Sequence, residues 1–483
     1  MYKALMLLFV SSIGLQAVSQ QTLKEKYRPQ FHFTPEKNWI NDPNGLIYYG
    51  GEYHMFYQYN PYGNTWGHMC WGHAVSKDLI HWSELPLAIK EEGDIMIFSG
   101  SAVVDPLNTS GFVKKAGQLP LIAVYTADQK DKNQSQHIAY SLDSGRTFTK
   151  FEFNPVIDLD RKDFRDPKVF WHEPSRKWIM LAVLADEKKI QIFHSKSLKA
   201  WTQVSEFGPV GDTSGIWECP DLFRAPVIGS PGNYKWVLMH SPAPYMQYFV
   251  GDFDGTKFIN ENKKDKIYRP DYGPDYYAAI TYNNILPSMG PVSIGWVNNW
   301  NYANEIPAGI WRGAMSLPRS LAVKRIGNEW ILVQNPIDQL NSILGPAKNY
   351  SVASPINLNT GSFELEWNWK DDGVGSSEMI LGNNELIIRF NKQTREIEMD
   401  RSGGSGVFQN DQFRKHSVYK SVFPVPAQGN LKFRLFFDQS IAELFVGDGD
   451  LVMTAQIFPD AINQVRFINT DQQIIVREAA GYR

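Results

Sequence analysis

The sequence has few cysteines, little net charge and no long apolar run in its interior. Two Cys among 483 residues exclude a disulfide-based scaffold and a metal site made of four thiolates. Lys and Arg number 48 against 51 Asp and Glu, without a basic cluster, which argues against a nucleic-acid partner. No stretch reaches the roughly 18 unbroken apolar residues of a membrane helix, so we expect no membrane association.

Apolar and aromatic residues, by contrast, are abundant. Hydrophobic residues make up 43% of the chain and charged residues 20%, which is enough to pack two or three domains. Aromatic residues reach 13%, including 15 Trp and 22 Tyr. Such flat rings suit a β-rich core, and they also suit the binding of sugar rings.

The first 19 residues have the pattern of a secretory signal peptide. Lys3 precedes a short apolar run, and Ala17-Val18-Ser19 resembles a cleavage site with small residues. The run is too short to cross a bilayer. We therefore predict cleavage near Ser19 and export to the periplasm or the extracellular space. A buried first strand is the alternative interpretation.

Strand-like segments dominate the chain as far as about residue 335, and long periodic helices are absent there. The segments are rich in β-branched and aromatic residues and are bounded by turn residues. The clearest are Glu52–Asn60, Leu121–Ala127, Lys177–Leu184, Tyr234–Ser241 and Val292–Asn299.

A polar turn closed by an aromatic residue follows each of the first four segments. The copies are Ser76–Trp82, Ser141–Phe148, Ser195–Trp201 and Asp252–Phe258, with a divergent fifth at Val323–Trp330. Their recurrence at intervals of roughly 55–70 residues in an all-β region favours propeller blades of four strands each. We predict a five-bladed β-propeller over residues 25–335; chance recurrence of common turns is the alternative.

The pattern changes after a linker that we place at residues 336–349. Phe363–Trp369 alternates apolar and polar residues, and residues 386–400 and 431–446 have the pattern of two hairpins. Short alternating strands with frequent turns predict a β-sandwich over residues 350–483. We expect the acidic residues of this part to lie on solvent-facing sides of the strands.

Acidic residues stand near the start of the innermost strand of several predicted blades. These are Asp42 in Asn-Asp-Pro-Asn-Gly, Asp166 in Arg-Asp-Pro, Glu218 in Trp-Glu-Cys-Pro and Asp275 in Asp-Tyr-Tyr-Ala. Innermost strands line one axial channel, so we predict that these acids converge in space. Each motif alone is also an ordinary turn sequence.

Clustered carboxylates suit the cleavage of glycosidic bonds. That reaction needs a proton donor to the leaving oxygen and a second carboxylate that attacks the sugar or positions a water molecule. Neighbouring carboxylates raise the pKa of one another, which keeps one of them protonated near neutral pH.

Several motifs together resemble those of glycoside hydrolase family 32, the invertases, levanases and inulinases. Residues 39–46, Trp-Ile-Asn-Asp-Pro-Asn-Gly-Leu, resemble the family signature, with Ile40 where Met is common. The similarity continues through residues 57–61, 66–67, 71–76, 98–101, 165–167, 217–220, 438–448 and 457–459. It covers nearly the whole mature chain, and the family combines a five-bladed propeller with a C-terminal β-sandwich.

The resemblance implies a role for each matched residue. Asp42 corresponds to the nucleophile, Glu218 to the general acid/base, and Asp166, beside Arg165, to the residue that stabilises the transition state. Residues expected around the terminal fructose are Asn41, Gln58, Trp66, Phe98 and Ser99, with Asp275 as a further substrate-contacting acid. The family retains anomeric configuration, so the carboxylates of Asp42 and Glu218 should lie about 5–5.5 Å apart.

The resemblance therefore implies an exported β-fructofuranosidase that hydrolyses terminal β-fructosyl units of fructans and sucrose through a covalent intermediate. It implies no metal, organic cofactor or protein partner. A fructosyltransferase or an endo-levanase would use the same acids, whereas an arabinanase or xylosidase would invert configuration. A non-catalytic fructan-binding propeller belongs to another class of function. The preference between β-2,6 and β-2,1 linkages stays open.

The two cysteines leave one structural question. Cys219 directly follows the expected acid/base, and we predict that it packs beneath the site. Pairing of Cys70 with Cys219 stays open at this point. His68, Cys70 and His73 are close in sequence, but their spacing fits no structural zinc pattern.

Overall fold

The computed structural model describes residues 25–115, 117–351, 355–404, 408–426, 429–469 and 473–479, and it is almost entirely β, as predicted. The predicted signal peptide, residues 1–19, lies outside these ranges. No helix within them is long and apolar enough to span a membrane. The helical elements described are α1 (Asp411–Lys415) and 3-10 turns at Glu173–Ser175, Pro287–Met289, Ala303–Glu305, Asp338–Ser342 and Ser402–Gly404.

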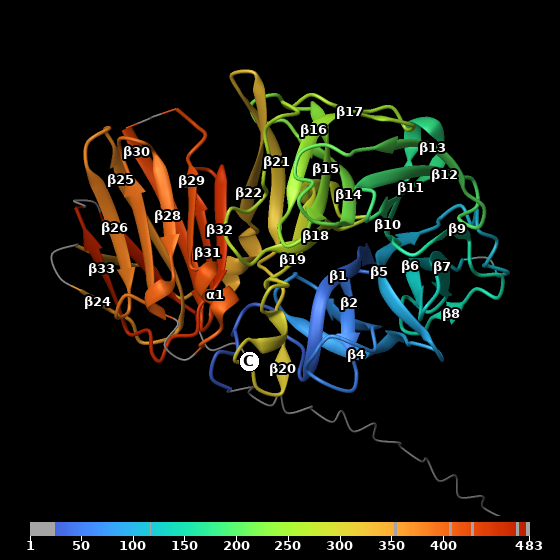
Figure 1. Ribbon diagram of the computed structural model, residues 1–483, viewed down its shortest axis with the longest axis horizontal. Helices are drawn as coiled ribbons and strands as arrows, with labels where there is room; N and C mark the ends of the chain where they lie inside the picture. The colour runs from blue at the N-terminus through green and yellow to red at the C-terminus, as the bar shows by residue number, and fades with distance from the viewer. Residues whose placement is uncertain are drawn as a thin grey trace, which may run out of the picture.

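Five antiparallel sheets form the N-terminal part of the molecule, the blue-to-yellow half of Figure 1. The first sheet contains β1 (Asn38–Tyr49), β2 (Glu52–Asn60), β3 (Cys70–Ser76) and β4 (Trp82–Ile89). The second contains β5 (Ile95–Val104), β6 (Leu121–Gln129), β7 (Gln134–Ser141), β8 (Thr149–Lys150) and β9 (Ile157–Arg161). The third contains β10 (Phe164–His172), β11 (Lys177–Leu184), β12 (Lys189–Ser195) and β13 (Thr202–Phe207). The fourth sheet contains β14 (Trp217–Pro226), β15 (Tyr234–Pro242), β16 (Gln247–Phe253) and β17 (Phe258–Asn260). The fifth contains β18 (Tyr277–Thr281), β19 (Val292–Trp296), β21 (Arg319–Ile326) and β22 (Glu329–Pro336).

The first strands of these five sheets close a ring. β1 contacts β5, β5 contacts β10, β10 contacts β14, β14 contacts β18, and β18 contacts β1. The short strand β20 (Trp311–Arg312) returns to pair in parallel with β1. Because each sheet begins at the centre, residues far apart in sequence meet around one axis.

The repeated polar turn joins the third and fourth strands of each sheet, where the sequence places it. In the first and third copies the same contacts form. The Ser76 and Ser195 hydroxyls accept backbone N–H bonds from Leu79 and Leu198, whose φ angles are +70° and +64°. The closing aromatics are fixed as well, because the indole of Trp82 donates to the Leu79 carbonyl. Local hydrogen bonding of this kind explains why the motif recurs.

The C-terminal part is a sandwich of two six-stranded sheets, as predicted. One sheet has the order β23 (Lys348–Tyr350), β34 (Ile474–Glu478), β25 (Ser362–Asp371), β30 (Gly429–Asp438), β31 (Ile441–Val446), β32 (Leu451–Gln456). The other has the order β24 (Ile356–Asn357), β33 (Gln464–Ile468), β26 (Ser376–Leu381), β27 (Leu386–Asn391), β28 (Glu396–Asp400), β29 (Val418–Val422). Both predicted hairpins form, as β27–β28 and β30–β31.

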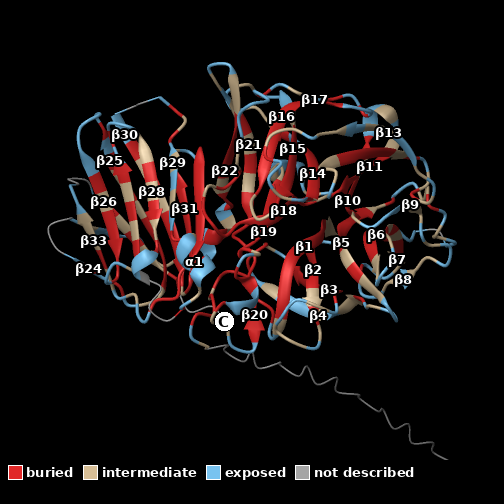
Figure 2. Ribbon diagram, in the orientation of Figure 1, coloured by how far each residue is buried: buried red, intermediate tan, exposed pale blue. Residues whose placement is uncertain are grey.

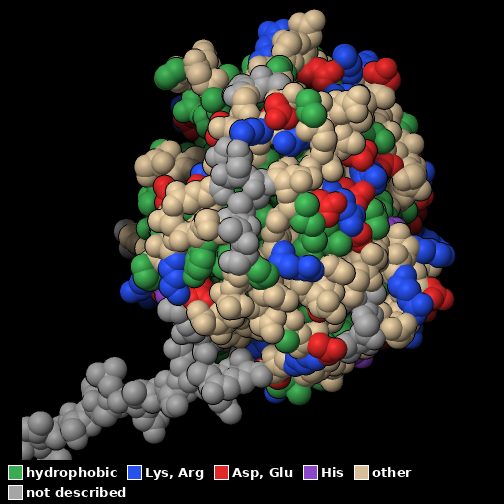
Figure 3. Space-filling view, turned by 90° about the vertical axis from the view of Figure 1, so that its left-hand side faces the viewer, with side chains coloured by type: hydrophobic (Ala, Val, Ile, Leu, Met, Phe, Trp, Pro, Cys, Tyr) green, Lys and Arg blue, Asp and Glu red, His purple; other side chains and the backbone are tan. Residues whose placement is uncertain are grey.

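The sandwich core consists of the alternating apolar residues of its strands. Phe363, Leu365, Trp367 and Trp369 of β25 are all fully buried against the opposite sheet. Figure 2 shows buried strands in both parts of the molecule and exposed loops around them. On the face in Figure 3, acidic and basic side chains are interspersed, so no strong field of one sign builds up there.

The expectation of solvated acids in the sandwich is wrong for five residues, because Glu364, Asp371, Asp438, Glu443 and Asp450 are buried. Two of these acids belong to a buried ionic cluster that joins the two parts. Glu443 of β31 is fully buried and binds Arg319 of β21 at 2.6 Å. Asp438 is also fully buried and accepts a 2.7 Å bond from the backbone of Phe31. His32 lies between them and contacts both carboxylates. These acids face the N-terminal part because the two domains dock through this side of the sheet.

One predicted strand ends early. The segment Val292–Asn299 is extended only as far as Trp296 in β19. The side chain of Asn298 accepts a hydrogen bond from the backbone of Asn299, and that of Asn299 accepts one from Asn301. These Asn side chains replace the ladder partners and turn the chain.

Candidate active site

A cavity of about 440 Å³ lies where the first strands begin. All predicted site residues except Asp275 line it: Asn41, Asp42, Gln58, Trp66, Phe98, Ser99, Arg165, Asp166 and Glu218. The structure also places three residues there that the sequence motifs did not identify, namely Asp128, Gln134 and Trp300. Asp42, Asp166 and Glu218 come from β1, β10 and β14, so three separate sheets supply the three carboxylates.

An irregularity in every first strand turns these residues toward the axis. The pairing with the second strand shifts at Ile40/Pro43, Ile97/Gly100, Arg165/Lys168, Glu218/Asp221 and Tyr277/Ile280. Within these bulges Asp166, Cys219 and Ala278 have φ angles of +62°, +48° and +52°. Left-handed backbone is uncommon for such residues and clusters at functional sites. The five bulges lie at equivalent positions, so together they build one cavity.

Asp42 is held by three donors. The side-chain amide of Asn41 donates to Oδ1 at 3.1 Å, and the Ser99 hydroxyl donates to Oδ2 at 2.6 Å. The thiol of Cys219 donates to the same Oδ2 at 3.3 Å. Asn41 is itself oriented by the indole of Trp39, which donates to its Oδ1 at 2.8 Å. The carboxylate therefore has one defined orientation in the cavity wall.

Cys219 connects Asp42 to Asp166. Its backbone N–H donates to Oδ2 of Asp166 at 2.9 Å, and its thiol lies 3.7 Å from the same atom. Burial raises the pKa of this thiol well above its ordinary value, and the neighbouring acids add to the effect. Cys219 thus packs beneath the site as a neutral donor, in agreement with the prediction. Cys70 and Cys219 are both free, which answers the question of their pairing.

Glu218 contacts one cation and one phenol. Arg165 donates through Nε to Oε1 at 3.2 Å, and the hydroxyl of Tyr277 donates to Oε2 at 2.5 Å. Burial raises the pKa of Glu218 above its ordinary value. The positive charge of Arg165 lowers this pKa in part, whereas the negative charge of Asp42 raises it further. Burial likewise raises the pKa of Asp166. A carboxyl group with a raised pKa can hold a proton near neutral pH and donate it.

A chain of hydrogen bonds fixes Arg165. The guanidinium donates to Gln134 at 3.0 Å and to Asp163 at 2.8 Å. Gln134 in turn donates to Asp128 at 3.0 Å. Neither Asp128 nor Gln134 belongs to a motif that we recognised, because both lie where β6 and β7 meet in a hairpin of unremarkable sequence.

The structure does not place Asp275 in the cavity. Its side chain is fully buried between the two domains, where Oδ2 lies 2.5 Å from Nη1 of Arg401 and accepts the backbone N–H of Gln456 at 2.7 Å. The hydroxyl of Tyr302 donates to Oδ1. The residue of the Asp-Tyr-Tyr-Ala segment that does contact the site is Tyr277, two positions later, which donates a hydrogen bond to Glu218.

The cavity has the groups that glycosidic bond cleavage needs. It offers a carboxyl group with a raised pKa, a second carboxylate on another strand, and a guanidinium and amides that can bind sugar hydroxyls. The aromatic rings of Trp66, Phe98 and Trp300 form its apolar walls. Within the described residues, no group of three His, Cys, Asp or Glu side chains is arranged to hold a metal ion.

Comparison with known proteins defines the class of this molecule. Residues 32–336 match the model of the glycosyl hydrolases family 32 N-terminal domain, and residues 334–480 match the family 32 C-terminal model. These matches span the cavity and the sandwich together, and they define the protein as a glycoside hydrolase. The chain belongs to glycosyl hydrolase family 32.

Named relatives and solved structures agree with this assignment. The chain is 44% identical to a levanase of Bacillus subtilis over 94% of its own length and 70% of the relative. It is 39% identical to an extracellular exo-inulinase of Aspergillus awamori over 90% of each chain. The crystal structure of an exo-inulinase from Aspergillus awamori superposes with a TM-score of 0.88 at 36% identity, covering 95% of this chain and 99% of the other. A β-fructofuranosidase from Schwanniomyces occidentalis, complexed with fructosyl-erythritol, gives 0.84 at 33% identity, covering 94% and 98%.

Proposed function

We propose that the protein is a retaining β-fructofuranosidase that releases terminal β-fructosyl units from fructans, namely levan and inulin, and from sucrose. The observation that carries this proposal is the convergence of Asp42, Asp166 and Glu218, from three separate sheets, on one cavity of about 440 Å³. We also propose that the five sheets are the five blades of the propeller expected for the family.

The proposed reaction has two steps. Asp42 attacks C2 of the fructosyl unit while Glu218 protonates the glycosidic oxygen, so that this bond breaks and a fructosyl ester of Asp42 forms. Glu218 then takes a proton from water, which attacks C2 and releases fructose and the Asp42 carboxylate. Asp166 and Arg165 hold the fructose hydroxyls and stabilise the positive charge that develops on the ring. The expected separation of 5–5.5 Å between the carboxylates of Asp42 and Glu218 stays a prediction.

Product analysis tests this assignment directly. Chromatography of digests of levan, inulin and sucrose should show free fructose as the first product of each. A ladder of oligosaccharides would instead indicate endo action, and fructosylated sugars at high sucrose would indicate transfer to sugar. NMR of the first anomer formed should show retained configuration; inversion would contradict the covalent mechanism.

Glu218→Ala should lower turnover by roughly 10²–10⁴-fold, because general-acid assistance is of that size. The loss should be smaller for a fructoside with an activated leaving group, which departs without a proton. Steady-state kinetics on sucrose and on such a substrate give both numbers. Equal losses on the two substrates, or unchanged activity, would remove Glu218 from the role of proton donor.

Tyr277→Phe should shift the alkaline limb of the pH profile of kcat/KM to higher pH. The hydroxyl of Tyr277 lowers the pKa of Glu218 by hydrogen bonding, so removing it lets the pKa rise further. Glu218 acts as the protonated acid, which is lost as the pH rises through its pKa; a higher pKa therefore preserves activity at higher pH. A profile that stays in place or moves to lower pH would contradict the assignment of this limb to Glu218.

We further propose that the protein is exported. The relatives from Aspergillus awamori and Aspergillus niger are named extracellular exo-inulinases, and residues 1–19 have the pattern of a signal peptide. N-terminal sequencing of the protein from the culture medium or periplasm should find the new terminus close to Ser19.

A further inference from the structure

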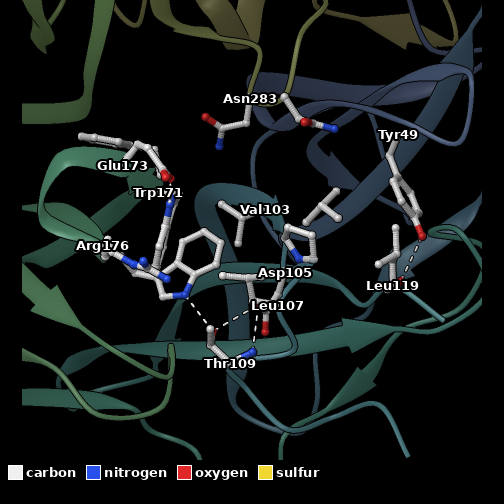
Figure 4. A pocket seen from close by; sticks show the side chains of 15 residues that line it. Tyr49, Val103, Asp105, Leu107, Thr109, Leu119, Trp171, Glu173, Arg176 and Asn283 are labelled. Atoms are coloured by element: carbon white, nitrogen blue, oxygen red, sulfur yellow. Dashed lines mark hydrogen bonds between the residues drawn. The ribbon is translucent and has the colours of Figure 1, made fainter. Parts of the chain in front are cut away.

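A second and larger cavity, of about 740 Å³, lies at the opposite end of the first strands. Tyr49 ends β1, Trp171 is the penultimate residue of β10, and Asn283 follows β18, whereas the active-site residues of these sheets lie at the strand starts. At about 3.3 Å per residue, the five residues from Asp166 to Trp171 separate the two cavities by about 16 Å. We call it the far-end cavity; Figure 4 shows its lining.

The ring is closed between the two cavities. Lys168 of β10 is buried beneath the site, where its Nζ pairs with Asp221 at 2.9 Å and donates to the carbonyl of Thr281 at 2.9 Å. The space that remains beneath the acids is only about 10 Å³. A sugar chain cannot pass along the axis, so a ligand in the far-end cavity leaves the active site free.

The far-end cavity is built before any ligand arrives. The indole of Trp178 donates to the Thr109 hydroxyl at 2.9 Å, and that hydroxyl donates to the buried carboxylate of Asp105 at 3.1 Å. Across the cavity, the hydroxyl of Tyr49 donates to the Leu119 carbonyl at 2.9 Å, as Figure 4 shows. Preformed walls of this kind are typical of ligand sites.

The lining combines aromatic rings with unused polar groups. Trp171 and Trp178 stand edge to face, with ring centroids 5.1 Å apart. Both N–H groups are already bonded, that of Trp171 to Glu173. Trp178 is buried and supports the partly exposed Trp171, so a ligand would meet the ring of Trp171. Asn283 donates its side-chain N–H groups to the carbonyls of Ala102 and Val169, but its side-chain oxygen has no partner among the described residues. The exposed guanidinium of Arg176 also lines this cavity and forms no hydrogen bond or ion pair with other described residues.

We propose that the far-end cavity is a second carbohydrate site, which holds an internal segment of the fructan chain. Aromatic faces bind the C–H surfaces of sugar rings, while the Asn283 oxygen and the Arg176 guanidinium suit neutral hydroxyls. The cavity is larger than the one that is expected to take a single terminal fructose, so it can hold more than one sugar unit. This inference rests on the proposed function, because a polymeric substrate is what a second site can retain.

A second site would raise activity on polymers only. An enzyme that removes one unit at a time stays near the next chain end if another part of the same fructan is bound, because binding at the second site raises the effective concentration. Sucrose is too small to bridge the two sites, so its hydrolysis would not depend on the far-end cavity.

Affinity electrophoresis through gels that contain levan or inulin tests the site. We would use the Glu218→Gln variant, which leaves the polymer intact, and add saturating sucrose to fill the active site. Retardation should persist with sucrose and disappear when Trp171→Ala is added. Arg176→Gln, at an exposed side chain, should weaken it without affecting the fold. Phe153→Ala, which removes a 70% exposed aromatic ring elsewhere on the same domain, is the matched control and should be retarded normally.

In the active enzyme, Trp171→Ala should raise KM for levan or inulin about two- to tenfold, the factor that one aromatic contact supplies. Kinetics on sucrose should stay unchanged, because the active site lies at the other end of the strands. The thermal midpoint should fall only as far as the lost contact with Trp178 requires. Retardation that sucrose abolishes, or that survives both substitutions, would overturn the proposal, as would equal retardation by dextran. An enzyme that releases no fructose at all would contradict the proposed function, while the dependence of retardation on Trp171 would still decide this inference.

Discussion

Replacing Asp42 by Ala should lower activity by on the order of 10⁵-fold or more, since removal of an enzymic nucleophile commonly has effects of that size. The three donors around its carboxylate, from Asn41, Ser99 and Cys219, contact both oxygens and fix the orientation of the carboxylate for attack. With a slowly released fructosyl donor, the wild-type protein should become labelled on the peptide that contains Asp42. Mass spectrometry of the digest identifies that peptide.

Asp42→Asn is the matched control for this experiment. The amide has the same size as the carboxylate, so packing of Trp39 and Cys219 around it is preserved. Label should be absent from Asp42→Asn as well as from Asp42→Ala. Label that persists at another residue in either variant would show that a different group is the nucleophile.

Asp275→Ala should cost about 3–5 kcal/mol of stability, because it leaves the buried guanidinium of Arg401 without its charged partner. The pair lies between the propeller side and the sandwich, and Tyr302 and the backbone of Gln456 complete it. Urea unfolding monitored by tryptophan fluorescence measures the loss. KM for sucrose in the folded fraction should change little, whereas a substrate-contacting Asp275 would show a raised KM at nearly normal stability.

A double variant separates the charge from the packing at this interface. Asp275→Ala combined with Arg401→Met removes both charges and leaves an apolar side chain in their place. It should recover part of the stability lost in Asp275→Ala, because no unpaired charge stays buried. If the double variant were less stable by the full sum of the two single losses, the pair would not be coupled.

Local patterns predicted the elements well where neighbouring residues decide the structure. The segments Glu52–Asn60 and Lys177–Leu184 coincide with β2 and β11, because β-branched and aromatic runs end there at turn residues. The polar turn of each sheet was visible for the same reason, since Ser76 and Ser195 bond to backbone only three residues away. Nine of the twelve residues that line the cavity belong to short motifs that a resemblance could transfer position by position.

Residues whose partners come from another sheet or domain were not predictable in this way. Asp275 stands in a segment that resembles a substrate-binding motif, yet its partner Arg401 lies 126 residues later in the sandwich. Glu443 has the sequence surroundings of an exposed strand residue, but domain docking buries it against Arg319. Asp128 and Gln134 line the cavity, and Gln134 connects Asp128 to Arg165 by hydrogen bonds.

By itself, the sequence determined the all-β character and the division into a repeated N-terminal part and a sandwich, and it predicted three acids for the site. Alternation, turn chemistry and motif spacing are properties of neighbouring residues, so they are present before the chain folds. Only the tertiary structure decided which acids share the cavity, which one joins the domains, and that a second cavity exists. Those outcomes depend on ring closure and on the docking of two sheets, which bring together residues that no local pattern relates.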